Sequence, residues 1–349
     1  MKVGLIIYAS IDTISGGYLY DRMLVSKLRE LGDSVEIISM PRSRYARNLL
    51  DNLTFQIGSD FDVLIQDELN HPSLFLANRR LDRSPIISIV HHLRSSERRP
   101  RWENTACRAV ERVYLETVDG FVFNSDATRA SVQGLTRESK PYVVATPGGD
   151  RLGQSTPEQV RERAQQAGPL RLISLGSVTP GKGLDILLDA LGSLPRNDFS
   201  LEVVGSGAAA PAFQENMRRK AQRLQLPVSF CGEVDDRVLG DKLRTSHALV
   251  LPSYYEGFGI AYLEGMAHGL PALGTRAGAI PDLISDDVSG YLLDPGDSRG
   301  LADRIRSLAS DRQLLTRLGL GALRRFASSP TWDQTTEAIR RFLLSVARQ

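Results

Sequence analysis

Short apolar runs alternate along the chain with segments whose apolar residues keep helical spacing, and this alternation starts twice. The first series of apolar runs lies at 1–8, 34–39, 62–66, 85–91, 120–124 and 141–145. The second lies at 170–175, 200–204, 228–231, 248–251 and 271–273. Short β-branched runs separated by helical segments are typical of a parallel sheet covered by helices. The pattern therefore predicts two Rossmann-like α/β domains.

A polar segment rich in glutamine and arginine, at about 151–169, separates the two series. A chain of 349 residues is too long for one ordinary core and suits two domains. We therefore expect an N-terminal domain over 1–168 and a C-terminal domain over 169–330. The last segment, 331–349, is predicted to be a helix with a basic tail.

Glycine-rich turns follow several predicted strands and precede predicted helices. Gly16 and Gly17 come before the helical segment 18–31, and glycines flank Lys182 before the helical segment 184–191. The loop 256–259 follows the strand at 248–251 and precedes helical spacing at 260–268. A strand, a glycine loop and a helix N-terminus in this order direct backbone N–H groups at a ligand beyond the strand, which suits an anion. Ligands are then expected at the carboxyl ends of the strands, in a cleft.

Two carboxylates, Glu256 and Glu264, lie eight residues apart, the first on this loop and the second inside the predicted helix. Glu264 stands among apolar neighbours. It is either a partly exposed helix residue or a carboxylate that accepts hydrogen bonds from vicinal hydroxyls of a ribose or hexose. Lys182 can act as a point charge beside helix N–H groups and match a diphosphate, although a surface lysine has the same local sequence.

The segment from Glu256 to Glu264 resembles the E-x7-E element of family 4 glycosyltransferases, which are retaining, nucleotide-sugar-dependent enzymes of the GT-B fold. Three further segments share the resemblance, at 176–183, 203–207 and 290–293. It covers most of the second half of the chain and is looser in the first half. The resemblance implies two Rossmann-like domains with parallel sheets facing a central cleft, of which the first binds the acceptor and the second the donor. It also implies that the C-terminal helix crosses back onto the first domain.

The resemblance also assigns roles to individual residues. It implies that His91, Lys182 and Glu256 are catalytic, that Glu264 binds the ribose, and that Glu256 binds the sugar. His91 ends a predicted strand, and His92 is its close competitor because side chains alternate along a strand. The family usually has an arginine where this chain has Ser177, and Arg276 is the candidate substitute. The further donor-binding positions that we expect are Gly16, Gly17, Ser177, Gly205, Gly257, Phe258 and Gly259.

Two other motifs have competing interpretations. Asp60-Phe61-Asp62 has a D-x-D form that holds a metal–nucleotide pair in another glycosyltransferase fold, but it begins a predicted strand, so we interpret it as surface. The loop that begins at Gly205 satisfies a G-x-G-x-x-A dinucleotide fingerprint. Because no matching acidic residue is clear, a loop facing the nucleotide of a sugar donor is the better interpretation. Neither His91 nor His92 pairs with His71 at metal spacing, so no metal site is expected.

Composition narrows the class of protein further. The hydrophobic content of 42% and charged content of 24% are typical of a soluble globular protein, and a net charge of +2 gives no reason to expect nucleic-acid binding. No stretch approaches the about eighteen apolar residues of a membrane span. Two distant cysteines fit a reducing compartment, so a cytoplasmic protein is expected.

Arginine clusters in the first half leave two interpretations open: contact with a lipid-linked or anionic acceptor at the inner face of a membrane, or a solvated surface. They comprise Arg42, Arg44 and Arg47, and Arg94, Arg98, Arg99 and Arg101.

The sequence therefore predicts a metal-independent, retaining transfer of a sugar from a UDP- or GDP-sugar to a hydroxyl of a glycan, a lipid-linked acceptor or a small molecule. No further cofactor is expected, and the oligomeric state is left open. Three alternatives remain. A sugar-nucleotide epimerase or hydrolase of the same fold would turn over the donor without an acceptor. An NAD(P)-dependent oxidoreductase would bind a nicotinamide cofactor through the Gly205 loop. A sugar-nucleotide sensor would bind the donor and turn nothing over.

Overall fold

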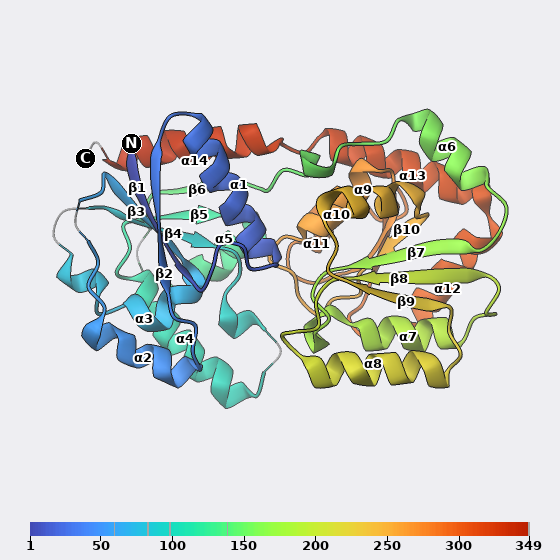
Figure 1. The fold of residues 1–349 in the computed structure, drawn as a ribbon, viewed down its shortest axis with the longest axis horizontal. Coiled ribbons are helices and arrows are strands. Elements are labelled where there is room, and N and C mark those ends of the chain that lie inside the picture. Colours follow the sequence, from blue (N-terminus) through green and yellow to red (C-terminus); the bar gives the residue numbers. More distant parts are fainter. Residues whose placement is uncertain (59, 82–83, 98, 138, 348–349) are drawn as a thin grey trace. The chain divides into compact units, whose positions relative to one another are not determined.

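The computed structural model describes residues 1–347 except 59, 82–83, 98 and 138. Its contacts divide the chain into two compact units, of which unit 1 comprises Met1–Pro147 with Thr331–Gln349 and unit 2 comprises Gly148–Pro330. The division thus falls between Pro147 and Gly148, whereas the sequence suggested a boundary between residues 168 and 169. Each unit contains a six-stranded, wholly parallel sheet with helices on both faces, which confirms the predicted α/β class (Figure 1).

The sheet of unit 1 has the strand order β2-β1-β3-β4-β5-β6. Strands of a parallel sheet covered on both faces read as continuous apolar runs, which is why the sequence pattern locates them. The strands are β1 (Lys2–Tyr8), β2 (Ser34–Met40), β3 (Val63–Asp67), β4 (Ile86–Val90), β5 (Gly120–Phe123) and β6 (Tyr142–Val144). The helices are α1 (Gly16–Glu30), α2 (Tyr45–Thr54), α3 (His71–Leu74), α4 (Arg101–Leu115), α5 (Asp126–Gln133) and α14 (Trp332–Ala347).

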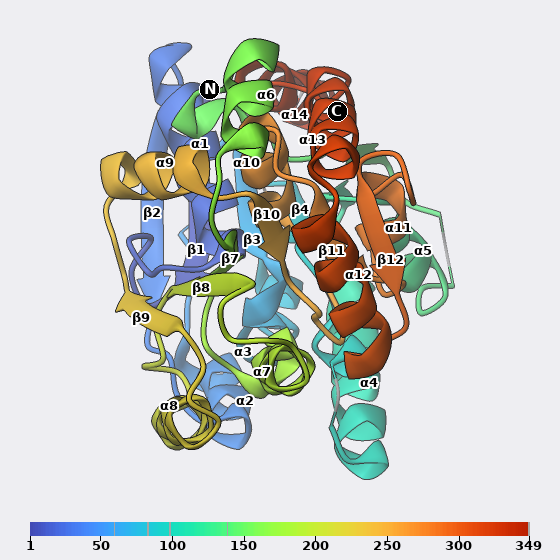
Figure 2. The same ribbon diagram turned by 90° about the vertical axis from the view of Figure 1, so that its right-hand side faces the viewer.

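Helices α1 and α14 cover one face of this sheet, and α2, α3 and α4 cover the other (Figures 1 and 2). Helix α14 is therefore part of unit 1, although it follows the whole of unit 2 in the sequence. Tyr20 of α1 packs edge-on against Trp332 of α14, with ring centroids 5.7 Å apart. Asp33 accepts hydrogen bonds from Arg340 and from the amino group of Met1. The packing of α14 thus completes the core of unit 1.

The sheet of unit 2 has the strand order β12-β11-β10-β7-β8-β9, which is the dinucleotide-fold order 3-2-1-4-5-6. Its strands are β7 (Leu170–Leu175), β8 (Phe199–Val204), β9 (Val228–Gly232), β10 (Ala248–Val250), β11 (Ala272–Thr275) and β12 (Gly290–Leu293). Its helices are α6 (Pro157–Gln165), α7 (Leu184–Gly192), α8 (Pro211–Arg223), α9 (Asp236–Thr245), α10 (Ile260–Ala267), α11 (Ile280–Leu283), α12 (Ser298–Ser310) and α13 (Arg312–Ala327).

The polar segment 151–169 is more ordered than a simple connection, because it contains helix α6. Thr156 and Gln159 form a reciprocal capping box at its N-terminus. Val160 and Ala164 are buried, and Arg163 donates to the backbone carbonyls of His268 and Gly269. The segment therefore packs as part of unit 2, which explains why the division falls before it.

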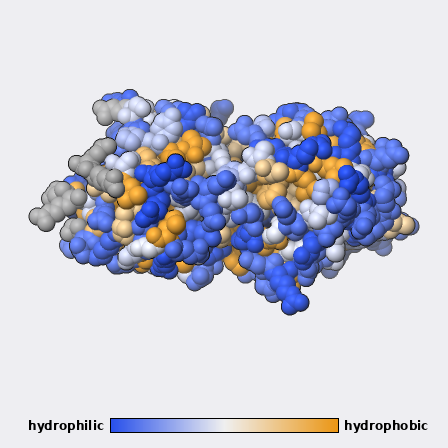
Figure 3. Space-filling model, turned by 90° about the horizontal axis from the view of Figure 1, so that it is seen from above, coloured by the Kyte–Doolittle hydropathy of each residue, from blue (hydrophilic) through white to orange (hydrophobic). Residues whose placement is uncertain are grey.

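The surface is consistent with the predicted globular class. On the face shown in Figure 3, hydrophilic residues predominate and hydrophobic ones lie in several separate groups. In the part of the chain that the structure describes, no helix combines the length and the apolar character needed to cross a bilayer.

Candidate functional site

The two loops that follow β7 and β10 meet at the carboxyl edge of the unit 2 sheet. Strands β7 and β10 are neighbours. From β7 the chain adds β8 and β9 on one side of the sheet, and from β10 it adds β11 and β12 on the other. In open α/β sheets this reversal point is where ligands bind, because the loops after the two strands diverge to opposite faces. The predicted residues Ser177 and Lys182 follow β7, and Glu256 to Gly259 follow β10. The structure thus brings these two groups of unit 2 together.

Lys182 ends a single 3-10 turn, η5 (Pro180–Lys182), directly before helix α7. Gly183, the N-cap of α7, has φ +67°, and a Cβ there would lie 2.0 Å from the carbonyl oxygen of Pro252. Only glycine fits this left-handed position against the neighbouring backbone. The close approach fixes the Lys182 turn on the loop after β10.

An ion pair joins the two loops: Lys182 Nζ donates to Glu256 Oε1 at 2.7 Å. The hydroxyl of Ser253 donates to the same oxygen at 2.8 Å. The backbone N–H of Tyr254 donates to the carbonyl of Gly181, and that of Ala279 to the carbonyl of Glu256. The Glu256 side chain is therefore held by two donors and its backbone by the segment before α11.

Helix α10 begins directly after this loop, with Gly259 as its N-cap at φ +97°. The side chain of Phe258 is buried, so this residue offers its backbone rather than its ring to a ligand. Gly205 follows β8 at φ +141°, and a Cβ there would lie 2.0 Å from the carbonyl oxygen of Gly176. The backbone N–H of Val178 donates to Ser206, which holds the Ser177 segment against the Gly205 loop.

Glu264 lies in the second turn of α10 and is buried, with an exposed fraction of 3%. Arg151, which sequence reasoning did not single out, donates to its Oε1 through Nε at 3.2 Å and through Nη2 at 2.7 Å. Arg151 also pairs with Asp236 at the start of α9. Burial raises the pKa of the Glu264 carboxyl, and the Arg151 charge opposes that rise. The partly exposed helix residue considered for Glu264 is therefore ruled out.

The backbone of Gly278 packs closely against the backbone of Glu256. Substitution of Gly278 tests whether this packing holds the Glu256 loop in place. A Cβ at Gly278 (φ +61°) would lie 1.9 Å from the carbonyl oxygen of Glu256, whereas at Gly296 (φ +90°) it would meet nothing within 4 Å. We expect Gly278→Ala to destabilise the protein by about 3 kcal/mol and to lower turnover, because the loop must shift. Gly296→Ala carries only the backbone strain of about 1 kcal/mol. Thermal unfolding and initial rates measure both; equal effects would contradict the proposed support.

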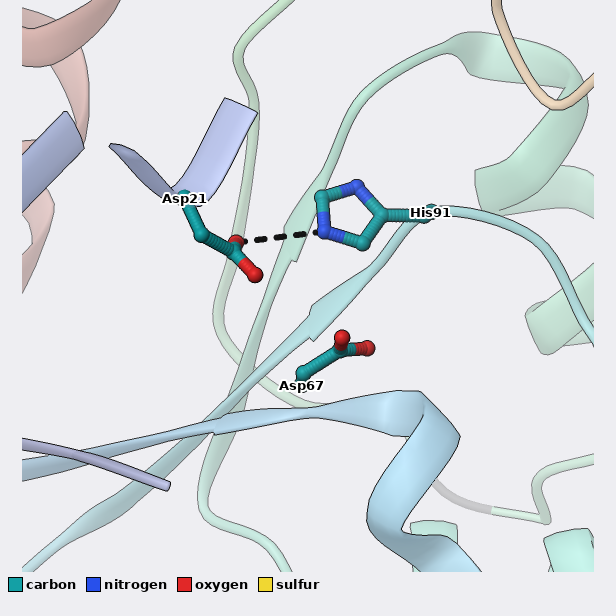
Figure 4. A group of neighbouring side chains, drawn as sticks. All are labelled: Asp21, Asp67 and His91. Carbon is teal, nitrogen blue, oxygen red and sulfur yellow. Dashed lines mark hydrogen bonds and ion pairs between the residues drawn. The ribbon is translucent and has the colours of Figure 1, made fainter. Parts of the chain in front are cut away.

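In unit 1, His91 directly follows β4 and belongs to a buried cluster with Asp21 of α1 and Asp67 of β3 (Figure 4). His91 Nε2 lies 3.2 Å from Asp21 Oδ1. Burial alone would lower the pKa of His91, but the carboxylates of Asp21 and Asp67 outweigh it and raise the pKa to about 9. The two carboxylates thus favour the charged form of His91. Nothing in the sequence near Asp21 or Asp67 indicated this pairing.

The ring of His91 is also fixed by its packing. Tyr20 lies edge-on to it at 5.3 Å between centroids, and a Cβ at Gly17 would lie 3.0 Å from its Cδ2. Gly17 therefore allows α1 to begin close to the imidazole, whereas a Cβ at Gly16 would meet nothing within 4 Å. His92, the competing histidine, pairs instead with Glu97 at 3.1 Å.

Several other candidates have local partners. Asp60 pairs with Lys2, and Asp62 accepts from the backbone N–H of Lys2, so the D-x-D segment lies at the amino end of the unit 1 sheet. Arg276, the candidate substitute for the missing arginine, pairs with Asp286 at 2.8 Å.

Of the arginine clusters, Arg94 stacks on the Tyr45 ring, Arg99 pairs with Glu97, and Arg98 lies outside the described residues.

Comparisons with known proteins agree with the fold. A family model described as "Glycosyl transferases group 1" matches residues 155–325. The chain is 29% identical over 303 residues to a phosphatidyl-myo-inositol mannosyltransferase of Mycobacterium leprae, covering 83% of this chain and 75% of that protein. It is 33% identical over 175 residues to a D-inositol 3-phosphate glycosyltransferase of Streptomyces avermitilis, covering 47% of this chain and 37% of that protein.

Two solved structures share the fold over nearly their whole length. Sucrose-phosphate synthase from Thermosynechococcus elongatus is 17% identical with a TM-score of 0.83, covering 99% of this chain and 98% of that one. Anabaena HepE, in complex with UDP and glucose, is 18% identical with a TM-score of 0.79, covering 99% and 100%. At these identities the likeness shows the fold alone.

Proposed function

Because the chain belongs to the group 1 glycosyltransferases and has the GT-B fold, we propose that it moves a sugar from a nucleoside diphosphate sugar to an acceptor hydroxyl with retention of configuration. The observation that carries this proposal is the ion pair of Lys182 with Glu256 at the reversal point of the unit 2 sheet. It places a cation, a carboxylate and two helix N-termini around one edge of the sheet. A cation and helix N-termini suit the diphosphate of such a donor, and a carboxylate suits the hydroxyls of its sugar.

The diphosphate would bind at the N-terminus of α7, beside Lys182. Helix N-terminal N–H groups and a lysine charge stabilise the negative charge that develops on the departing diphosphate. Such preorganised groups contribute roughly 3–4 kcal/mol per donor to transition-state stabilisation. With Ser177 in place of the family's arginine, Lys182 carries a larger share of this charge. We propose that it does so without a catalytic metal ion.

Glu256 and Glu264 would bind the two sugar rings of the donor. Glu256 lies on the loop beside Lys182, and we propose that its carboxylate accepts from hydroxyls of the transferred sugar. Both hydrogen bonds from Arg151 go to Oε1 of Glu264. We propose that the other oxygen, Oε2, accepts from the ribose hydroxyls. Arg151 would then keep a buried carboxylate ionised and oriented for that contact.

Unit 1 would supply His91 as a catalytic cation, together with the glycines at the start of α1. The raised pKa of His91 supports this role, because an imidazolium stabilises negative charge on a reacting sugar diphosphate.

A donor screen with the purified full chain tests the proposed function. We expect UDP or GDP, or one of their sugars, to raise the thermal unfolding temperature. The matching sugar nucleotide should then be consumed only with an acceptor, and NMR of the product should show the anomeric configuration of the donor. Turnover without acceptor would favour the hydrolase or epimerase. A shift with NAD and none with nucleoside diphosphates would refute the proposal, and an inverted product would refute the retaining outcome.

The metal-free mechanism is tested separately with a chelator. We expect initial rates in excess EDTA to stay within about twofold of those without it, because Lys182 and the helix N-termini carry the diphosphate charge. The assay is run at a temperature at which circular dichroism shows the chelated protein to be folded. Loss of activity in folded protein that magnesium restores would overturn this mechanism.

A further inference from the structure

Unit 1 contains a second buried cluster of ionisable side chains, which has no role in the proposed reaction. It consists of Glu68 from the 3-10 turn η1 (Glu68–Asn70), His71 from α3 and Glu111 from α4. Their exposed fractions are 0%, 1% and 0%. One ligand atom from each lies within 4.8 Å of the other two. Three metal-ligating side chains from η1, α3 and α4 therefore converge in the interior.

The cluster sets two carboxyl groups against a single imidazole in the described part of the chain. His71 is the only residue there that forms an ion pair with either glutamate, its Nδ1 lying 3.0 Å from Glu68 Oε1. Neither carboxylate oxygen of Glu68 accepts a hydrogen bond from any described residue. A buried carboxylate that accepts no hydrogen bond is costly even beside one countercharge. The imidazole of His71 is therefore the one group in the described part of the chain that offsets two buried carboxyl groups.

The geometry suits a metal ion in that place. Ligand atoms about 2.1 Å from a metal and separated by angles of about 90–110° lie roughly 3.0–3.5 Å apart, as His71 Nδ1 and Glu68 Oε1 do. Glu68 and His71 are three residues apart, the Glu-x-x-His spacing by which helices present a carboxylate and an imidazole to one metal.

The outer groups of the cluster are in place as well. Tyr45 Oη lies 2.9 Å from His71 Nε2. Glu111 accepts from Ser95, through the backbone N–H at 2.9 Å and the hydroxyl at 2.5 Å. Metal-binding histidines and carboxylates are oriented by hydrogen bonds of this kind, which fix the tautomer and the side-chain position.

We propose that Glu68, His71 and Glu111 bind a divalent transition-metal ion that stabilises unit 1. One imidazole and two carboxylates are donors that Zn²⁺, Mn²⁺ and Fe²⁺ all accept. The Nδ1 lone pair of His71 faces the ion, in place of its hydrogen bond to the Glu68 carbonyl, and Nε2–H donates to Tyr45. The ion adds positive charge between the two carboxylates and joins η1, α3 and α4. None of its three ligands belongs to the His91 cluster or to the proposed donor-binding residues of unit 2.

Metal analysis of the full chain, purified without a polyhistidine tag, tests the proposal. We expect about one equivalent of zinc, manganese or iron per chain in the wild type and nearly none in Glu68→Gln. Asp67→Asn is the matched control. Asp67 is the adjacent buried carboxylate, but it belongs to the His91 cluster and accepts a hydrogen bond from the backbone N–H of Leu69. It should keep the metal. Metal retained in Glu68→Gln, or lost in Asp67→Asn alone, overturns the assignment.

A measurement on the wild type keeps the test independent of how the variants fold. Removing the metal with EDTA and dialysis should lower the unfolding temperature by about 5 °C or more, and added Zn²⁺ or Mn²⁺ should restore it. Mg²⁺ at the same concentration should restore it less, because it prefers oxygen ligands and retains its waters. Wild-type protein that contains no stoichiometric metal and shows no shift with EDTA, Zn²⁺ or Mn²⁺ would refute the proposal.

Discussion

Lys182→Ala is expected to lower kcat by at least about tenfold, with a much smaller change in stability. Its ammonium group is the cation that the structure places at the carboxyl edge of the unit 2 sheet, 2.7 Å from Glu256. Its removal takes away charge stabilisation that grows as the diphosphate departs, so the loss falls on kcat rather than on KM alone. Steady-state kinetics with the donor identified by the thermal-shift screen measure the effect.

Lys242→Ala is the matched control for this variant. Lys242 makes a lysine–glutamate pair of the same length, 2.7 Å to Glu202, also within unit 2 but on α9 and β8. Its removal deletes the same charge from the same unit without touching the loops after β7 and β10. We expect its kcat to stay within about twofold of wild type, since partly exposed pairs contribute little. If the two variants behave alike, the role of Lys182 is wrong.

Arg151→Met is expected to destabilise the region around α10 by about 3–5 kcal/mol, because it leaves the buried Glu264 carboxylate without its countercharge. Both tryptophans, Trp102 and Trp332, belong to unit 1, so their fluorescence does not report on this region. Hydrogen exchange of the α10 amides measures the local free energy of opening instead. Arg317→Met removes an exposed pair with Asp287 and should cost less than about 1 kcal/mol.

A double-mutant cycle then separates the structural role of Glu264 from its role in donor binding. Arg151→Met combined with Glu264→Gln should recover part of the stability lost in Arg151→Met, because the buried charge is gone. Glu264→Gln and Glu264→Ala should each weaken donor binding, measured as the donor Kd, and Arg151→Met combined with Glu264→Gln should not recover the loss seen in Glu264→Gln. Unchanged donor affinity in Glu264→Ala would refute the ribose contact.

The strands and the loops of the candidate site were predictable because their causes are local. A strand buried on both faces is a continuous apolar run, and the glycines that precede α7 and α10 are required by left-handed backbone at Gly183 and Gly259. The polar appearance of 151–169 misled for the opposite reason. Helix α6 buries only one narrow face, so most of its residues are hydrophilic although it belongs to unit 2.

The sequence pattern could not predict which distant residues pair with each other. Lys182 and Glu256 are 74 positions apart, and Arg151 and Glu264 are 113 positions apart. Such pairs depend on strand order, which the periodicity of a single chain does not contain. The Glu68 cluster was missed for a related reason. His71 was compared with the other histidines, whereas the structure places it with carboxylates from its own turn and from α4.

The inclusion of α14 in unit 1 affects how the chain folds during synthesis. A ribosome completes Gly148–Pro330 before it makes the segment that packs on α1. Unit 2 can therefore fold before unit 1 is complete. Until the segment of α14 has been made, Tyr20 has no Trp332 against which to pack, and the apolar surface of α1 that α14 covers stays exposed. Premature termination after residue 330 would therefore leave a finished unit 2 joined to an incomplete neighbour that is prone to aggregate.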